Sequence, residues 1–238
     1  MSGDCHRWGY TNTNGPDKWC KGYPIAAEGK RQSPIDIKTS DVKLDADLKE
    51  NPLKTKYKPE DTISLVNNGH TITCNIQAKS TLVGGPIKKD KYLLGQFHLH
   101  WGSSDDKGSE HTIDGKQFSA ELHLVHYKKE YGSISNAADK KDGLAVLGVM
   151  ITPGSENSTF QKIIDEISNL KKKDTEITVP NELDPASLLP ENISDYWTYA
   201  GSLTTPPLYE TVQWIVFKNP VEFSTEQIIR ALCIIDQR

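Results

Sequence analysis

The sequence predicts a mainly β fold with a few helices (α+β), built as a single domain over residues 1–238. Short runs of β-branched, aromatic and aliphatic residues recur along the chain, which is typical of strands. Glycines and prolines are scattered between these runs, and no repeat or low-complexity linker divides the chain. With 36% hydrophobic residues, a chain of this length can bury one large core.

Six runs have the composition of strands, and two segments begin as helices do. The predicted strands are 63–66, 71–76, 92–101, 118–127, 144–152 and 211–217. The predicted helices span 159–170 and 225–232, because each follows a capping box, formed by Ser158 with Gln161 and by Ser224 with Gln227. We expect both helices to cover the edge of a sheet.

The charge balance and the apolar content exclude two classes of partner. Lys and Arg total 28 against 32 Asp and Glu, so the net charge of −4 attracts neither nucleic acid nor an anionic membrane. Nowhere do 18 apolar residues run together, and residues 1–19 lack the apolar stretch of a secretory signal. We therefore expect a cytoplasmic protein with reduced thiols at its four cysteines, Cys5, Cys20, Cys74 and Cys233.

Two segments of predicted strand carry histidines at alternate positions. The period of a strand places Gln96, His98 and His100 on one face of the first, and Glu121 and His123 on one face of the second. If the strands are neighbours, three imidazoles meet. Three neutral imidazoles suit Zn²⁺ and leave a fourth tetrahedral position open, which is typical of a catalytic zinc site. The alternative is that these histidines line an ordinary polar sheet face.

Five motifs occur along nearly the whole chain. They are QSPID at 32–36, QFHLHWG at 96–102, SEH at 109–111, AELHLVH at 120–126 and YWTYAGSLTTPP at 196–207. Together they resemble the α-class carbonic anhydrases of the cytosolic vertebrate type. The resemblance implies a large, mostly antiparallel twisted sheet and a zinc lyase that reversibly hydrates carbon dioxide to bicarbonate and a proton, by attack of zinc-bound hydroxide. It further implies a monomer that binds sulfonamide inhibitors and acts in pH homeostasis.

The resemblance also implies roles for single residues. It makes His98, His100 and His123 the zinc ligands, with Gln96 orienting His98 and Glu121 orienting His123. It implies three catalytic residues: Thr204 holds the hydroxide and donates its own proton to Glu110, while His70 shuttles protons to buffer. Read from the residues alone, Thr204 lies in an ordinary turn and His70 is a solvated turn histidine.

The remaining implied roles concern the proton path and the pocket. The water chain to His70 is implied to run past Tyr10, Asn68 and Thr73. The implied substrate-binding set is Val125, Val146, Leu203, Thr204, Thr205, Val212 and Trp214, although five of these read equally well as core residues. Ile134 is implied to lie at the pocket rim, where it affects inhibitor preference. Of the other histidines, His6 is a second candidate for proton transfer, and His111 and His126 are expected to be structural.

The chain departs from the family towards its C-terminal end. The pattern drifts after Ile229, so the domain is expected to lack the usual segment after about residue 230. In the family that segment accepts the outer N–H of the middle ligand, so His100 is expected to lose its orienting partner. An alternative function is therefore a carbonic-anhydrase-like protein with impaired or no activity. A non-catalytic binding module and a zinc esterase with another substrate are further alternatives, and the three retained histidines argue against the module.

Overall fold

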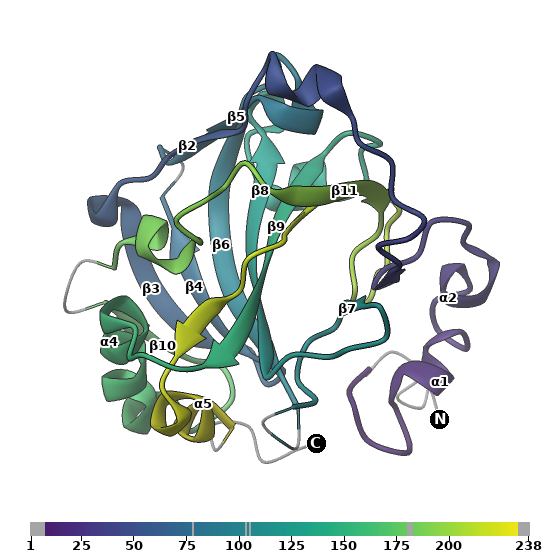
Figure 1. The fold of residues 1–238 in the computed structure, drawn as a ribbon. Coiled ribbons are helices and arrows are strands. Elements are labelled where there is room, and N and C mark those ends of the chain that lie inside the picture. The colour runs from purple at the N-terminus through teal and green to yellow at the C-terminus, as the bar shows by residue number, and fades with distance from the viewer. Residues whose placement is uncertain (1–7, 78, 103, 105, 180–182, 233–238) are drawn as a thin grey trace.

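A computed structural model describes residues 8–77, 79–102, 104, 106–179 and 183–232 of the chain. Its centre is a large twisted mixed sheet in the order β10-β3-β4-β6-β8-β9-β12-β11, with β2, β5 and β13 attached (Figure 1). The strands are β2 Lys54–Lys56, β3 Thr62–Asn67, β4 Ile72–Ile76, β5 Thr81–Val83, β6 Tyr92–Trp101, β8 Ala120–Lys128, β9 Leu144–Pro153, β10 Thr175–Thr178, β11 Tyr196–Gly201, β12 Val212–Phe217 and β13 Val221–Phe223. The predicted fold class is confirmed, and each of the six predicted strands is present.

Most strand pairs of this large sheet are antiparallel, and its two parallel pairs both involve β9. It pairs with β8 in antiparallel fashion on one side and with β12 and β13 in parallel fashion on the other. A second, two-stranded sheet joins β1 (Asp36–Ile37) to β7 (Thr112–Ile113), also in parallel. The long strands β6, β8 and β9 are buried on both faces, which explains why they read as nearly continuous apolar runs.

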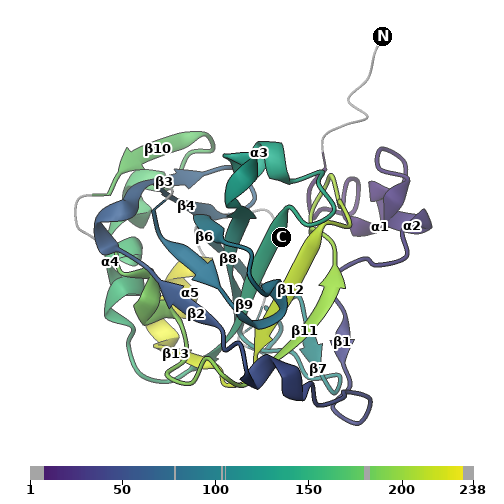
Figure 2. The ribbon, with the colours of Figure 1, turned by 90° about the horizontal axis from the view of Figure 1, so that it is seen from above.

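The helices are short and lie on the outside of the sheet. They are α1 Pro16–Trp19, α2 Ile25–Glu28, α3 Ile134–Ala137, α4 Ser158–Glu166 and α5 Thr225–Leu232, with 3-10 turns at Ala46–Lys49, Pro59–Asp61, Gly85–Ile87, Lys129–Tyr131, Ile167–Leu170 and Pro185–Leu188. Both views place α4 and α5 side by side on one flank, far from α1 and α2 (Figures 1 and 2). No helix in the described ranges is both long enough and apolar enough to span a bilayer.

One of the two predicted helix starts is wrong. Ser224 and Gln227 do form a reciprocal capping box, since the Gln227 N–H donates to Ser224 Oγ and the Ser224 N–H donates to Gln227 Oε1. At α4, however, the cap is Asn157, whose Oδ1 accepts the N–H of Phe160 at 2.9 Å. The helix therefore begins at Ser158, and its last predicted turn is a 3-10 segment.

The sheet separates two apolar clusters. One face packs Phe97, Leu99, Leu122 and Leu124 against the apolar sides of α4 and α5. The other face holds a smaller cluster, whose fully and partly buried members include Val125, Val146, Val212, Trp214, Ile134 and Leu203. The histidine side chains of β6 and β8 lie beside this second cluster, so the fold places them at the edge of an apolar pocket.

Candidate metal centre

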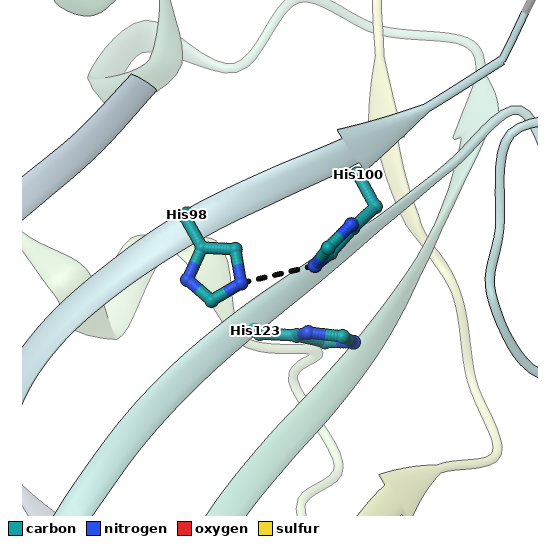
Figure 3. Close-up of side chains that lie close together, drawn as sticks. All are labelled: His98, His100 and His123. Atoms are coloured by element: carbon teal, nitrogen blue, oxygen red, sulfur yellow. Dashed lines mark hydrogen bonds between the residues drawn. The ribbon is translucent and has the colours of Figure 1, made fainter. Parts of the chain in front are cut away.

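Three histidines from adjacent strands meet on one face of the sheet. His98 and His100 come from β6 and His123 from β8, and His98 lies directly opposite His123 in the register. Figure 3 shows the three rings converging on one point. Each offers a ring nitrogen that lies within 4.8 Å of the other two. The tertiary structure thus brings together the three residues that the strand period placed on one face.

The spacing of these nitrogens fits a metal ion. His98 Nε2 and His100 Nε2 are 3.0 Å apart, so a proton or a cation must separate their lone pairs. Tetrahedral Zn²⁺ with bonds of 2.0–2.1 Å holds its nitrogens about 3.3 Å apart, close to this separation. Burial lowers the pKa of His98 to about 3, with the charge of His123 acting in the same direction. A neutral imidazole in this position is a good zinc ligand and a poor proton acceptor.

The outer nitrogens of two of the rings are held by side chains from the same strands. His98 Nδ1 donates to Gln96 Oε1 at 2.8 Å, which turns Nε2 toward the centre. His123 Nε2 donates to Glu121 Oε1, also at 2.8 Å, which leaves Nδ1 for the centre. These bonds select one tautomer of each ring, as is usual around metal sites.

Glu121 is a fully buried carboxylate whose two oxygens accept four hydrogen bonds. Oε1 accepts from His123 and from His111 Nδ1, and Oε2 accepts the N–H groups of Glu110 and His111. Burial would raise the pKa of Glu121, but the two imidazoles and their hydrogen bonds outweigh burial and hold it well below its usual value. In His123 the charge of Glu121 likewise outweighs burial, and the pKa is raised.

His111 extends this network away from the metal centre. Its Nε2 lies 2.6 Å from the Tyr199 hydroxyl, which donates to Ser33 Oγ at 2.9 Å. Ser33 is tied in turn to Ser202 by two hydrogen bonds, one in each direction. The structural role expected for His111 is thus a specific one, because it joins the metal centre to the turn that carries Thr204.

That turn is held against the segment before β1. The Arg31 N–H and the Gln32 side-chain amide both donate to Glu210 Oε1, and Gln32 Nε2 also donates to the Leu208 carbonyl. Thr204 is buried and hydrogen-bonds to the Glu110 carboxyl. Burial raises the pKa of Glu110, while the charge of His123 and the bond from Thr204 oppose part of that shift.

The expectation that His100 loses the orienting partner supplied by the segment after about residue 230 stays a prediction, because residues 233–238 lie outside the described residues. The Nδ1 atom of His100 lies 3.3 Å from Glu110 Oε1. Both side chains are well shielded from solvent, with 5% of His100 and 15% of Glu110 exposed. Residues 233–238, which include most of the expected departure from the family, lie outside the described residues, as do His6 and Cys5.

The residues of the expected proton path form two groups of contacts. Asn68 Nδ2 donates to Thr73 Oγ1 at 3.3 Å, and Thr73 is the strand partner of His98. The His70 ring stacks on Trp8, with ring centroids 3.8 Å apart, and Tyr10 meets His70 edge to face. Sequence reasoning missed Trp8, because nothing in its local sequence indicates a partner so far along the chain.

The remaining predicted residues divide between the pocket and the core. Val125, Val146, Val212 and Trp214 are almost completely buried, and Leu203 is partly buried in the same cluster, whereas Thr205 lies in the turn beside Thr204. Cys74 is buried and Cys20 is exposed, and neither forms a disulfide. His126 is fully buried and meets the Tyr57 hydroxyl at 2.8 Å, away from the three converging histidines.

A mixed sheet that presents three inward histidines beside an apolar pocket defines a class of zinc enzyme with an open coordination position. The model of the eukaryotic-type carbonic anhydrase family matches residues 14–236. Carbonic anhydrase 1 of Mus musculus is 49% identical over 225 residues, which cover 93% of this chain and 84% of the relative. Carbonic anhydrase 1 of Monodelphis domestica is 48% identical over 227 residues, with 94% and 84% covered.

The chain therefore belongs to the eukaryotic-type carbonic anhydrase family. It is a zinc lyase that catalyses the reversible hydration of carbon dioxide. The alternative of a related protein without activity is not favoured.

Proposed function

We propose that His98 Nε2, His100 Nε2 and His123 Nδ1 hold the zinc ion. The observation that carries this assignment is the convergence of the three rings, each within 4.8 Å of the others by a ligand atom. The bonds from Gln96 and Glu121 support the assignment, because they fix which nitrogen of His98 and His123 faces inward. His111, Glu121 and His123 form a second group of the same kind, but their hydrogen bonds to one another already use the Glu121 oxygens.

When bound, zinc acts as a Lewis acid that activates a water molecule as a nucleophile at neutral pH. The protein's own residues orient that water and its substrate. Thr204 accepts a hydrogen bond from the water, because its own proton is donated to Glu110. The apolar walls formed by Val125, Val146 and Trp214, together with Leu203 and Val212, receive carbon dioxide and bind charged bicarbonate weakly. Thr205, in the turn beside Thr204, completes the substrate-binding set.

Proton release is assigned to the path that begins at Thr73 and Asn68 and ends at His70. An imidazole at the mouth of the site can exchange a proton with buffer near neutral pH. Tyr10 lies beside His70 and lines the adjoining cavity, where it can hold water between the two ends of the path.

The wider role is proposed from charge, composition and relatives. The net charge of −4 and the free thiols of Cys20 and Cys74 suit a cytoplasmic enzyme. Residues 1–238 are assigned to one carbonic anhydrase domain that acts as a monomer, binds sulfonamides and serves pH homeostasis. None of these roles requires a nucleic acid or membrane partner.

The ligand assignment is tested by single substitutions at the histidines. The wild-type protein should bind one equivalent of zinc, measured by atomic absorption after gel filtration, and should hydrate carbon dioxide in a stopped-flow assay. His98→Ala should lose most of the zinc and nearly all of the hydration activity, since two ligands remain. His126→Gln, which changes a buried histidine outside the centre, should keep its zinc. Retention of full zinc content and activity in His98→Ala would contradict the assignment.

The proton path is tested through its dependence on buffer. His70→Ala should turn over more slowly than wild type at low buffer concentration and recover when imidazole is added, because a small base replaces the missing shuttle. The hydration step itself should be unchanged, as shown by carbon dioxide–bicarbonate isotope exchange at equilibrium. Equal turnover of the variant and the wild type at low buffer would remove His70 from the path.

A further inference from the structure

The turn that carries Thr204 contains a residue in an unfavourable backbone conformation. Leu208 has a φ of 61°, in the left-handed region that residues with a Cβ rarely adopt, and its N–H donates to the Thr205 carbonyl at 3.0 Å. Residues in that region persist only where the surrounding structure holds them. The shape of this turn, and with it the place of Thr204, therefore depends on contacts from outside the turn.

Two successive residues before β1 supply such contacts. Gln32 Nε2 donates to the Leu208 carbonyl at 3.1 Å and to Glu210 Oε1 at 3.2 Å. The backbone N–H of Arg31 donates to the same carboxylate oxygen at 2.7 Å, and the Arg31 guanidinium donates to the Glu210 carbonyl at 2.6 Å. The Glu210 carboxylate thus holds the residue whose side chain supports Leu208.

We infer that Glu210 is a positioning residue for Thr204, and that it acts by fixing Arg31 and Gln32 against the turn. The inference rests on the role proposed above for Thr204, whose hydroxyl accepts a hydrogen bond from the reacting water. Glu210 contacts neither that water nor the three histidines in this arrangement. It acts on the reaction only through the position of the turn.

The Glu210 carboxylate is well suited to this task. The hydrogen bond from the Arg31 N–H is the main reason why the pKa of Glu210 lies below its usual value, and the bond from Gln32 acts in the same direction. Hydrogen bonds to a charged acceptor are stronger than those between neutral groups. At Gly29 a Cβ would lie 2.5 Å from Glu210 Oε1 and 2.8 Å from Gln32 Nε2, so the lack of a side chain there lets the two groups meet.

Hydrogen bonds matter here because one side of the turn faces open space. Gln32, Thr204 and Leu208 all line a cavity of about 580 Å³, so side-chain packing restrains the turn less on that side. Thr204 also hydrogen-bonds to the Glu110 carboxyl, and a shift of the turn changes the direction of its hydroxyl. A misplacement of about 1 Å at a reacting group can slow a reaction about 100-fold.

The value of kcat/KM for carbon dioxide hydration, measured by stopped flow on zinc-loaded protein, tests the inference. Glu210→Ala should lower kcat/KM about 10-fold to 100-fold, because Thr204 is misplaced, and should keep the zinc content of the wild type. Glu210→Gln retains an oxygen that can accept the Arg31 N–H and should recover most of the activity. The matched control is Glu222→Ala, since Glu222 Oε2 also accepts a backbone N–H, that of Ser155 at 2.9 Å, but lies on β13. It should leave kcat/KM unchanged.

A double-mutant cycle separates positioning of Thr204 from a general structural effect. Thr204→Val removes the hydroxyl and should lower kcat/KM by itself. In that background the further effect of Glu210→Ala should shrink to about threefold or less, because no hydroxyl remains to be positioned. If Glu210→Ala does not fold, Gln32→Met replaces it in the cycle, because it removes both bonds of the Gln32 amide and keeps a side chain of similar size.

Amide hydrogen exchange, followed by NMR, reports on the turn without reference to activity. The N–H groups of Leu203 and Leu208 are bonded within the turn, to the carbonyls of Tyr209 and Thr205. Both should exchange faster in Glu210→Ala than in the wild type, because the turn opens more often. Neither should change in Glu222→Ala.

Three results would overturn the inference. They are a folded Glu210→Ala, or its substitute Gln32→Met, with the kcat/KM of the wild type; equal losses of kcat/KM in the wild-type and Thr204→Val backgrounds; and unchanged exchange of Leu203 and Leu208 in Glu210→Ala. A Thr204→Val protein with the kcat/KM of the wild type would instead contradict the proposed role of Thr204, on which the inference depends. The two failures are therefore distinguishable.

Discussion

At the scale of single residues, buried polar groups carry the chemistry of this protein, and hydrogen bonds stabilise them. Glu121 shows the principle, since a carboxylate with no exposed surface is tolerated because four donors surround it. His126, by contrast, is buried in its neutral form. It lies in apolar surroundings with the Tyr57 hydroxyl on one nitrogen and the Ala145 carbonyl near the other, and burial lowers its pKa to about 3.

The lowered pKa of His126 predicts a loss of stability in acid. The unfolded chain binds a proton at this residue below a pH of about 6.5, whereas the folded chain does not until a pH of about 3. Stability contributed by neutral His126 is therefore fully present above pH 6.5 and is lost progressively as the pH falls toward 3. We expect a loss of about 1.4 kcal/mol between pH 7.5 and pH 5.5 from this residue.

Urea unfolding of the zinc-loaded protein at the two pH values measures this effect. His126→Gln should be less stable than wild type at both values, but the difference in its unfolding free energy between them should be smaller by about 1.4 kcal/mol. Zinc keeps His98, His100 and His123 unprotonated in both proteins, so they do not contribute to the comparison. Identical pH dependence of the two proteins would exclude this contribution from His126.

At the scale of elements, glycine decides how α3 meets the sheet. Gly95 lies in β6 where the register with β8 shifts, between Leu94 and Gln96. A side chain there would place its Cβ 2.6 Å from Ile134 Cδ1 and 3.2 Å from Tyr127 Cδ1. Ile134 can therefore pack over the strand next to Gln96, the residue that orients His98, only because position 95 has no side chain.

A double-mutant cycle tests this packing. Gly95→Ala should destabilise the protein by about 1–3 kcal/mol, because the new methyl group overpacks the contact. Ile134→Ala removes the obstructing side chain, so the double variant should be more stable than the sum of the two single effects predicts. Urea unfolding of the four proteins gives the coupling energy. Strict additivity would show that Gly95 and Ile134 do not share this contact.

At the scale of the whole molecule, one sheet supports two different apolar faces. The cluster under α4 and α5 provides most of the buried side chains, and the cluster on the other face lines the metal centre. Since zinc binds the folded arrangement of three histidines from two strands, it should stabilise the entire domain by mass action.

Thermal unfolding should therefore depend on zinc. Free zinc at about 1,000 times its dissociation constant adds about 4 kcal/mol of stability. For a domain of this size that corresponds to a rise in Tm of about 8–16 °C. Differential scanning calorimetry with zinc and with a chelator measures the shift, and His100→Ala serves as the control that should not respond. An equal Tm with and without zinc in the wild type would contradict binding at a site built by folding.

The sequence by itself determined the family, the mainly β class, the six long strands and the residues that share a strand face. These features depend on local periodicity and on contiguous motifs, which a linear reading can detect. It also located the α5 capping box, since Ser224 and Gln227 are three residues apart. It misplaced the α4 cap, because Asn157 and Ser158 both have side chains suited to capping and only the helix path decides between them.

Only the tertiary structure decided what surrounds those residues. It placed His98 opposite His123, put Trp8 against His70, and turned Glu110 toward His100. The local sequence of each segment does not indicate its partner. These contacts arise instead from strand order and from where loops cross the sheet. The physical reason is that hydrogen bonding and burial act through space, whereas periodicity acts along the chain.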